Sequence, residues 1–580
     1  MKRFAIILAL FFATTLYASA TGDVKRHMPE WMNDAIFYQV YPSSFMDTDG
    51  DGIGDLAGIR SKLDYIQSLG VNTIWMNPTF ESGWEDGGYD VIDFYKIDPR
   101  FGTNDDMVAL IDEAHARGMK VLLDLVAGHS SNKHPWFIES SQGTNLHYSD
   151  FYIWADELQS NNQGVDQAGM QVAPMMRGRF VEGNYPRAKY YQRNAGPFQP
   201  ALNYGFAEPD PNHPWEQPVD APGPKAMRRE LRNIMQFWFE KGVDGFRVDM
   251  AASLVKNDKD NKANIALWSE VRDWMEEEWS DRVLVSEWGN PSTAVEAGFH
   301  MDFMFHFGIP GYPEMLFDRQ TPFGNYGRHW TYPYCYFDLE GKGEVKTFVE
   351  NFVNATESIK GSGYISVPSS NHDYQRPNVG TRNTIDQLKV TMTFFLTLPG
   401  VPILNYGDEI GMKFYMDLPS KEGSGNRSGV RTPMQWTNGY NAGYSTCKPE
   451  DLYLPIDTDG GALTVETQEG DPNSLLNYTR QLLALRNSSK ALGNDAEWEL
   501  VSNVDQPYPM VYKRTDGNET FIIALNPSKK AVSAKITHQD GEAAELVAGS
   551  NTKKSSYKFS KENDQIKMDG VSALVYKITK

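Results

Sequence analysis

Two hydrophobic patterns alternate along most of the chain. Stretches with an apolar residue at every third or fourth position, typical of amphipathic helices, lead through a glycine into a short unbroken apolar run, typical of a buried strand. Three such helix–glycine–strand units span residues 59–76, 107–126 and 227–250. Further apolar runs lie at residues 35–40, 283–286, 364–367 and 401–404. The repeated units predict an α/β fold with parallel strands, and a closed (β/α)8 TIM barrel is the simplest arrangement of this many units.

The repeat is interrupted once and stops before the C-terminus. Between residues 129 and 204, Asn, Gln, Gly, Pro and aromatic residues replace the periodic pattern, which predicts a small domain inserted after the third strand. A helix at 474–486 closes the barrel, and the short apolar runs beyond it predict antiparallel strands. We therefore expect barrel segments at 21–128 and 205–492, the inserted domain at 129–204 and a C-terminal β domain at 493–580.

The first 20 residues have the pattern of a secretory signal peptide. Lys2 and Arg3 precede an apolar run at 4–18, and Ala18-Ser19-Ala20 supplies the small residues that a signal peptidase requires. The run is too short to span a membrane comfortably, and no later stretch reaches the required length. We expect an exported protein, periplasmic or secreted, without membrane insertion.

Composition excludes several classes of function. With 40% hydrophobic and 13% aromatic residues in 580, the chain can bury large cores. Its net charge of −21 becomes −23 when Lys2 and Arg3 leave with the signal peptide, so nucleic acids and anionic lipids are poor candidates as partners. Only two cysteines, Cys335 and Cys447, are present, which excludes a disulfide framework and leaves a single bridge open.

Polar residues gather where the predicted strands end. They are Asp124 and His129 after the third strand, Arg247 and Asp249 at the fourth, Glu287 at the fifth, and Asn371, His372 and Asp373 after the seventh. The C-terminal ends of barrel strands meet at one face, so these side chains should surround one cavity. Retaining glycosidases use two carboxylates about 5–5.5 Å apart as nucleophile and acid/base. Asp249, held ionised by Arg247, is the candidate nucleophile, although this Arg–Asp pair could instead be purely structural.

The spacing of these residues resembles the α-amylase superfamily, glycoside hydrolase family 13. The matching segments are Asp124-Leu-Val-Ala-Gly-His129, Gly245-Phe-Arg-Val-Asp249, Val285-Ser-Glu287-Trp288, Ser370-Asn371-His372-Asp373 and Gln199-Pro-Ala-Leu-Asn203. The resemblance covers nearly the whole mature chain and implies a barrel, an inserted B domain and a C-terminal β-sandwich. It also implies that Asp249 is the nucleophile, Glu287 the general acid/base and Asp373 the transition-state stabiliser. His129, Arg247 and His372 would hold the reacting sugar.

Two positions depart from the family pattern. The family usually has Asn where this chain has Gly128, and relatives with a Gln-Pro-Asp-Leu-Asn segment have Asp where this chain has Ala201. The first change removes a polar contact that supports the site, and the second removes a contact from the inserted domain. Neither change touches the three acids.

Other segments point to oligosaccharide substrates. Gly88-Tyr89-Asp90 and residues 430–436 are similar to oligo-1,6-glucosidases, α-glucosidases and trehalose synthases. The resemblance implies that Tyr89, Asp90 and Arg431 bind the terminal sugar, as in an exo-acting α-glucosidase for malto-oligosaccharides or related α-glucans. A salt bridge that merely ties two loops is the structural alternative. Because residues 431–455 are most similar to trehalose synthases, an isomerase or transglycosylase is the alternative function, followed by an endo-acting α-amylase or neopullulanase and by a non-catalytic carbohydrate-binding protein. Linkage preference and oligomeric state stay open.

One loop has the spacing of a calcium site. Oxygen donors stand at loop positions 1, 3, 5, 7 and 9, contributed by Asp47, Asp49, Asp51, the Ile53 carbonyl and Asp55. The bidentate Glu of an EF-hand is missing, because Gly58 stands at position 12. The same loop is seen in oligo-1,6-glucosidase-like relatives, so we expect a structural Ca²⁺ rather than only an acidic turn.

Overall fold

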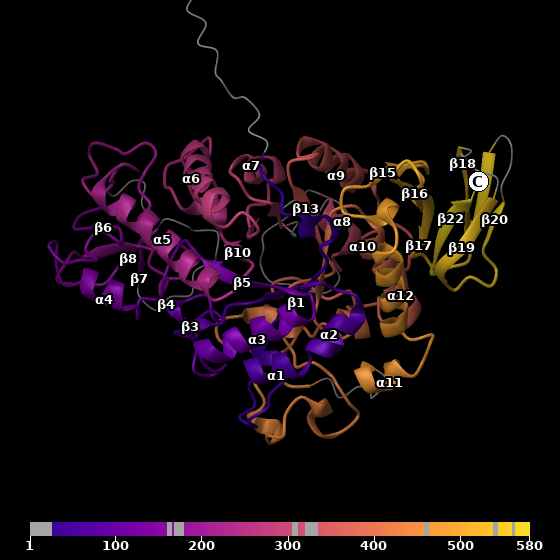
Figure 1. Ribbon diagram of the computed structural model, residues 1–580, viewed down its shortest axis with the longest axis horizontal. Helices are drawn as coiled ribbons and strands as arrows, with labels where there is room; N and C mark the ends of the chain where they lie inside the picture. The colour runs from indigo at the N-terminus through magenta and orange to yellow at the C-terminus, as the bar shows by residue number, and fades with distance from the viewer. Residues whose placement is uncertain are drawn as a thin grey trace, which may run out of the picture.

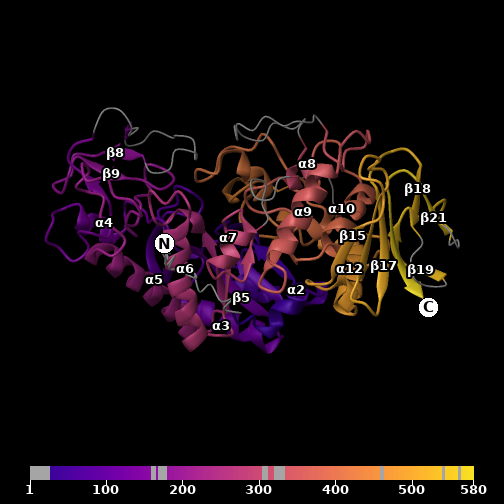
Figure 2. The same cartoon turned by 90° about the horizontal axis from the view of Figure 1, so that it is seen from above.

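The protein was analysed as a computed structural model, which describes residues 26–158, 165–167, 179–303, 311–318, 334–456, 463–537, 543–558 and 563–579. The predicted signal peptide lies outside the described residues. A closed barrel of parallel strands forms the centre of the molecule, with the inserted segment and the C-terminal strands at opposite ends (Figures 1 and 2). The barrel prediction is therefore confirmed.

Eight strands close the barrel in the order in which the chain forms them. They are β1 (Phe37–Val40), β2 (Thr73–Met76), β5 (Lys120–Val126), β10 (Gly245–Asp249), β11 (Val283–Ser286), β12 (Met301–Asp302), β13 (Tyr364–Pro368) and β14 (Val401–Asn405). The hydrophobic pattern did not locate the sixth strand, β12, because it contains only two residues. β1 pairs with both β2 and β14, which completes the ring.

Helices cover the outside of the barrel. They are α1 (Leu56–Ser61), α2 (Leu63–Leu69), α3 (Asn104–Ala116), α5 (Pro222–Glu240), α6 (Lys262–Glu278), α7 (Pro291–Glu296), α8 (Tyr312–Leu316), α9 (Lys346–Ser358), α10 (Ile385–Thr397), α11 (Val465–Glu469) and α12 (Leu475–Asn487). Local signals set their ends: Thr103 and Asp106 form a capping box at the start of α3. Gly70 ends α2 with φ 95°, a conformation that favours glycine.

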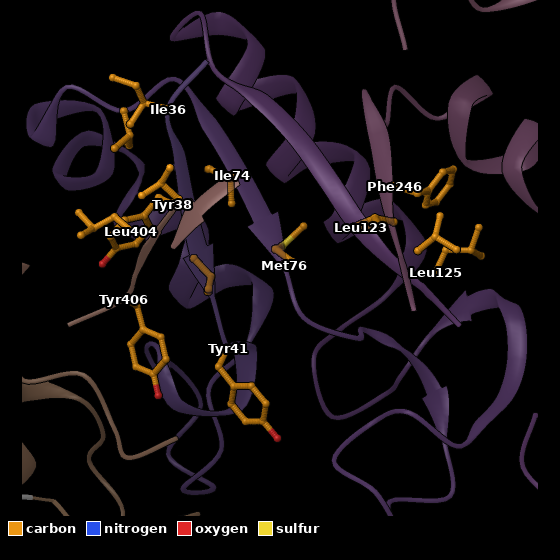
Figure 3. Packing of buried hydrophobic residues seen from close by; sticks show 14 of the residues in the cluster. Ile36, Tyr38, Tyr41, Ile74, Met76, Leu123, Leu125, Phe246, Leu404 and Tyr406 are labelled. Carbon is orange, nitrogen blue, oxygen red and sulfur yellow. The ribbon is translucent and has the colours of Figure 1, made fainter. Parts of the chain in front are cut away.

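Side chains alternate between two cores along the barrel strands. Trp75, Leu122 and Val285 belong to the cluster inside the barrel. Their neighbours in sequence belong to the larger cluster between strands and helices, and Figure 3 shows Ile74, Leu123 and Phe246 in this layer. The alternation decides which strand residues point inward, and at the strand ends it therefore decides which polar residues can meet.

The segment between β5 and α5 contains one helix and a separate small sheet. The helix is α4 (Pro135–Ser140), and the strands are β6 (Trp154–Ala155), β7 (Val165–Gln167), β8 (Phe180–Glu182) and β9 (Tyr190–Gln192), in the order β6-β9-β8-β7. Aromatic residues pack around Phe137, whose ring stacks on Trp154 with centroids 5.2 Å apart. A two-stranded sheet, β3 (Phe80–Ser82) and β4 (Val91–Ile97), follows β2. The domain boundaries that we drew from the sequence stay predictions.

The C-terminal region consists of two antiparallel sheets. One has the order β15 (Glu497–Leu500), β16 (Met510–Thr515), β17 (Thr520–Asn526), β22 (Ser572–Thr579), β19 (Ala543–Ser550), and the other β18 (Val532–Thr537), β21 (Asn563–Met568), β20 (Ser556–Lys558). Val511, Ile522 and Ile566 belong to one apolar cluster that draws on both sheets. The first sheet also contacts α10, where the hydroxyls of Thr397 and Tyr512 lie 2.5 Å apart.

Two smaller expectations concern the cysteines and the membrane. Cys335 and Cys447 are both buried and free, so they do not pair with each other. Among the described residues, no helix combines the length and apolar character needed to cross a membrane.

Candidate active site

The ends of neighbouring strands bring the predicted acids together. β10 pairs with β5 so that Arg247 lies beside Asp124. It pairs with β11 so that Val248 lies beside Ser286, and the ladder continues with the Glu287 N–H donating to the Val248 carbonyl at 3.0 Å. Arg247 and Asp249 are two residues apart on one strand and therefore share a face.

Arg247 is the centre of this cluster. Its Nη1 lies 2.8 Å from Asp124 Oδ1 and 3.0 Å from Asp249 Oδ1, and its Nη2 lies 2.8 Å from Glu287 Oε2. The guanidinium side chain is 1% exposed, so water cannot screen these contacts. One cation thus serves three carboxyl groups, which cannot all be ionised at low cost in a buried site.

Glu287 shows most clearly the effect of having one cation for three carboxyl groups. Burial raises its pKa to about 7, with Arg247 opposing the shift and Asp249 adding to it. The Met250 N–H also donates to Glu287 Oε2 at 2.9 Å, from a backbone with φ 49°. A carboxyl group with this pKa can carry a proton near neutral pH and deliver it to a leaving group.

Asp373 is held in the opposite way. Its Oδ1 lies 2.8 Å from Arg431 Nη2 and 3.0 Å from Arg427 Nη1, and its Oδ2 lies 3.3 Å from His372 Nε2. Although burial opposes ionisation, His372, Arg427 and Arg431 hold the pKa of Asp373 well below its usual range. Asp373 therefore stays ionised and can stabilise positive charge that develops nearby.

A hydrogen-bonded chain connects the two groups of acids. Gln39 Nε2 lies 2.9 Å from His372 Nδ1. Because the amide nitrogen donates, His372 Nδ1 accepts, and we therefore assign the imidazole proton to His372 Nε2. His372 Nε2 lies 2.7 Å from the Tyr89 hydroxyl, which donates to Asp124 Oδ2 at 2.9 Å. Tyr89 also stacks on His372 with ring centroids 5.5 Å apart. Tyr89 and His372 therefore lie among the strand-end acids, and their role in binding sugar stays a prediction.

The structure forms no ion pair between Asp90 and Arg431, which was the structural alternative to their predicted role in binding the terminal sugar. Asp90 is fully buried, and its Oδ1 accepts from the N–H groups of Glu85 and Asp86, both at 3.1 Å. Burial raises the pKa of Asp90 to about 7, with the two N–H groups opposing the shift. Arg431 contacts Asp373 instead. The turn at residues 85–90 folds back on Asp90, so this carboxyl group supports its own loop.

A different pair ties the two loops together. Arg427 Nη2 lies 2.7 Å from Asp86 Oδ1, while Arg427 Nη1 contacts Asp373. Gln199, from the inserted segment, donates to the other Asp86 oxygen at 3.1 Å. Sequence reasoning missed Asp86 and Arg427. The only signal was position: Arg427 lies four residues before Arg431, and Asp86 lies four before Asp90.

The sixth strand adds one more residue that the sequence analysis missed. Asp302 ends β12, and its Oδ1 accepts from the Ser286 hydroxyl at 2.7 Å and from the Trp288 N–H at 3.1 Å. Asp302 therefore fixes the residues on both sides of Glu287. A two-residue strand gave no pattern from which to find it.

His129 is brought to the site but uses both ring nitrogens within the protein. Its Nε2 lies 2.9 Å from the Tyr89 carbonyl, and its Nδ1 lies 3.1 Å from Asn194 Nδ2. Ala201 is buried and forms a backbone bridge with His129. The inserted segment therefore contacts His129 in two ways, through the Asn194 side chain at the imidazole and through Ala201 at the backbone.

The predicted calcium loop places three carboxylates together. Single oxygens of Asp47, Asp49 and Asp55 lie within 4.8 Å of one another, whereas Asp51 is not part of this group. Burial raises the pKa of Asp51, and the nearby charges of Asp49, Asp47 and Asp55 add to the shift. The Ile53 N–H donates to Asp51 Oδ1 at 2.8 Å. A crowded set of oxygen donors fits a hard cation such as Ca²⁺, which Asp47, Asp49 and Asp55 would hold.

The acids do not line every hollow of the molecule. A cavity of about 700 Å³ lies at the other end of the barrel, where Tyr364 begins β13 and Gly400 precedes β14. None of the strand-end acids lines it. The chemistry of the strand ends, rather than the size of this cavity, identifies the candidate active site.

Comparison with known proteins agrees with this geometry. A family model described as "Alpha amylase, catalytic domain" matches residues 39–495. The chain is 32% identical to a trehalose synthase/amylase from Mycobacterium tuberculosis over 540 residues, covering 86% of this chain and 82% of that protein. It is 30% identical to an oligo-1,6-glucosidase from Heyndrickxia coagulans over 561 residues, covering 87% and 94%. Among solved structures, an isomaltulose synthase from Erwinia rhapontici shares the fold, with a TM-score of 0.76, 23% identity and coverage of 96% and 100%.

Proposed function

Because the chain belongs to the α-amylase family, glycoside hydrolase family 13, we propose that it is a retaining, exo-acting α-glucosidase for malto-oligosaccharides and related short α-glucans. The observation that carries this proposal is that the surroundings of Asp249 and Glu287 favour different protonation states. Arg247, 3.0 Å from Asp249 Oδ1, favours an ionised Asp249, while burial raises the pKa of the neighbouring Glu287 to about 7. Such a pair can act as nucleophile and general acid/base.

In the proposed reaction, Asp249 attacks the anomeric carbon while Glu287 protonates the departing glycosidic oxygen. The C–O bond breaks, and a glucosyl ester with Asp249 forms. Glu287, now ionised, then takes a proton from water, and the resulting attack releases glucose with retained configuration. Asp373 stabilises the positive charge on the sugar ring in both steps.

The exo-acting mode rests on the contacts around Asp373. Arg427 connects Asp373 to Asp86, and Gln199 adds a contact from the inserted segment. We infer that these contacts close one side of the site, so that only a terminal sugar would fit there. We further propose that the protein is exported and that the loop at 47–55 holds a structural Ca²⁺. Neither point is needed for the chemistry.

A second candidate is a trehalose synthase-like isomerase. The observation in its favour is the similarity to the mycobacterial trehalose synthase/amylase, which covers as much of the chain as the similarity to oligo-1,6-glucosidase. The two reactions share the glucosyl-enzyme intermediate and differ in the acceptor, which is water in one and the retained glucose in the other. The same enclosed site suits both.

Product analysis separates these functions. Purified protein is incubated with maltose, isomaltose, trehalose, sucrose, pullulan and starch, and products are followed from the first minutes. Release of glucose from maltose or isomaltose, with α-configuration in early samples, is the expected result. Trehalose formed from maltose would identify the isomerase instead. A fall in starch viscosity well before reducing ends accumulate would identify an endo-acting amylase.

A further inference from the structure

Position 128 requires a glycine because a neighbouring side chain leaves no space for a Cβ atom, and not because its backbone conformation favours glycine. Its φ lies outside the left-handed region that favours glycine. A Cβ atom placed on it would instead lie 2.5 Å from Asn194 Nδ2, far inside van der Waals contact, and 3.6 Å from Leu254 Cδ2, an ordinary contact. The Asn194 amide therefore occupies the space that any side chain at position 128 would need.

Asn194 comes from the inserted segment and reaches two residues of the candidate active site. Its side chain is 1% exposed, its Nδ2 lies 3.1 Å from His129 Nδ1, and the same nitrogen lies 3.8 Å from Met250 Sδ. Its backbone N–H donates to the Gln199 carbonyl at 3.0 Å, which anchors it within its own loop. Asn194 is therefore held through its backbone N–H as well as through its side-chain NH₂ group.

These contacts define the protonation of His129. The Tyr89 carbonyl can only accept, so His129 Nε2, 2.9 Å away, carries the proton. His129 Nδ1 then has a lone pair, and only a donor can satisfy it. An amide NH₂ is such a donor, whereas a carboxylate at position 194 would face the lone pair unfavourably unless the imidazole became doubly protonated.

We propose that Asn194 is a positioning residue of the active site, and that Gly128 exists to admit it. Asn194 holds His129 as the neutral Nε2–H tautomer and seats Met250, whose N–H binds Glu287 Oε2 at 2.9 Å. The inserted segment thereby orients both the imidazole and the acid/base. This inference rests on the proposed function for its kinetic consequences, but the tautomer of His129 does not depend on it.

A double-mutant cycle tests the steric part. Gly128→Ala and Asn194→Ala should each lower kcat about tenfold with a smaller change in KM, because small misplacement of reacting groups is costly. In the double variant, Gly128→Ala should add no further loss, since its Cβ no longer meets the amide. Gly143→Ala and Asn145→Ala, in the same inserted segment, are the controls; the Gly143 Cβ would meet only Leu146 Cδ1 at 3.9 Å. Additive losses in the cycle would overturn the proposal.

The variant Asn194→Asp tests the positioning part. Its kcat relative to wild type should rise as the pH falls from 8 to 5, because protonation of His129 restores a hydrogen bond to the carboxylate. The same ratio for Asn194→Ala should stay flat. A flat ratio for Asn194→Asp as well would show that Asn194 only fills space.

Nitrogen NMR of ¹⁵N-histidine-labelled protein provides a measurement that does not require activity. The His129 signals, assigned by their loss in His129→Gln, should report an unprotonated Nδ1 in wild type and, in Asn194→Asp, conversion to a doubly protonated ring as the pH falls from 8 to 5. An unchanged His129 spectrum in Asn194→Asp would overturn the inference. If the spectra change as expected but no glycoside is cleaved, the proposed function fails and the positioning role stands.

Discussion

The strand β10 has a buried carboxylate near each of its ends, and the two are held in opposite ways. Asp244, just before the strand, has Oδ2 2.6 Å from His115 Nε2, and Oδ1 3.0 Å from Lys120 Nζ and 3.3 Å from Arg282 Nη1. Although burial opposes it, the hydrogen bond from His115, together with the Val121 N–H and Lys120, lowers the pKa of Asp244.

At the other end of the strand the ratio of charges is reversed. Asp249 shares the cation of Arg247 with Asp124 and Glu287, and burial raises the pKa of Glu287 to about 7. The three basic groups around Asp244 keep it ionised, and this fixed charge stabilises the fold. The single guanidinium of Arg247 among three carboxyl groups leaves one carboxyl able to gain and lose a proton near neutral pH. Both ends of the strand are buried, so the balance of charges, more than burial, distinguishes Asp244 from the acids that we propose to be catalytic.

The largest effect is expected from Asp249→Asn. The amide cannot form the covalent glucosyl ester, so kcat should fall by about 10⁴-fold or more while the fold persists. Steady-state kinetics on maltose and a circular dichroism melt measure the two quantities. Activity within tenfold of wild type would make Asp249 a structural acid like Asp244 and would end the comparison.

Glu287→Gln should reduce kcat by about 10²–10⁴-fold on natural substrates. The loss at glycosylation should be smaller for nitrophenyl glucosides, whose leaving groups need no proton. Because the Glu287 pKa is about 7 and the acid must be protonated, wild-type kcat/KM should fall as the pH rises through 7. This alkaline limb should vanish in the variant. Equal losses on both kinds of substrate, or a persisting limb, would exclude Glu287 as the acid.

Asp244→Asn should affect stability and leave kcat per folded molecule unchanged. Removing the shared partner leaves His115, Lys120 and Arg282 uncompensated, at a cost of about 2–4 kcal/mol in the free energy of unfolding. The lower part of this range reflects the partial exposure of His115 and Lys120, at 34% and 30%. Urea denaturation measures the change.

The matched control for this variant is Asp281→Asn, because the Asp281 side chain is 63% exposed and also contacts Arg282. It should cost less than about 0.5 kcal/mol. Since the pKa of Asp244 is lowered by folding, its contribution is present above the ordinary aspartate pKa and is lost as the pH falls through the folded value. The two variants should therefore converge in stability in strong acid. A kcat loss in Asp244→Asn would contradict a purely structural role.

The last effect, which is no larger than that of Asp244→Asn, is expected from calcium. Asp47, Asp49 and Asp55 form a third arrangement, in which carboxylate oxygens lie within 4.8 Å of one another and, in our proposal, hold an external cation. Calcium should raise the melting temperature by a few degrees, since an ion at about 100 times its Kd stabilises by about 2.7 kcal/mol. A chelator should reverse the shift, magnesium should give a smaller one, and Asp49→Ala should abolish it. Coincident melts with calcium and with chelator would reduce the loop to an acidic turn.

Much of the fold and of the acid cluster followed from local sequence. The helix–glycine–strand pattern predicted the barrel, and Arg247 and Asp249, two residues apart on one strand, had to face the same way. Strand β12 was not predicted because two residues show no periodicity, and Asp302, which ends this strand, was therefore not identified as a site residue. A role for Asp90 and Arg431 in binding the terminal sugar was inferred from a resemblance and stays a prediction, whereas the ion pair that joins the two loops is formed by Asp86 and Arg427.

What the sequence determined by itself is therefore the identity and strand position of the acids, because strand periodicity and barrel closure are consequences of local pattern. Only the tertiary structure decided which loop residues meet. Asp86 and Arg427 are 341 positions apart, and their contact depends on the path of two turns whose residues have no hydrophobic period. Asn194 and Gly128 are a second example. The reason for a glycine at position 128 is apparent only in the structure, where the Asn194 amide occupies the space that a side chain there would need.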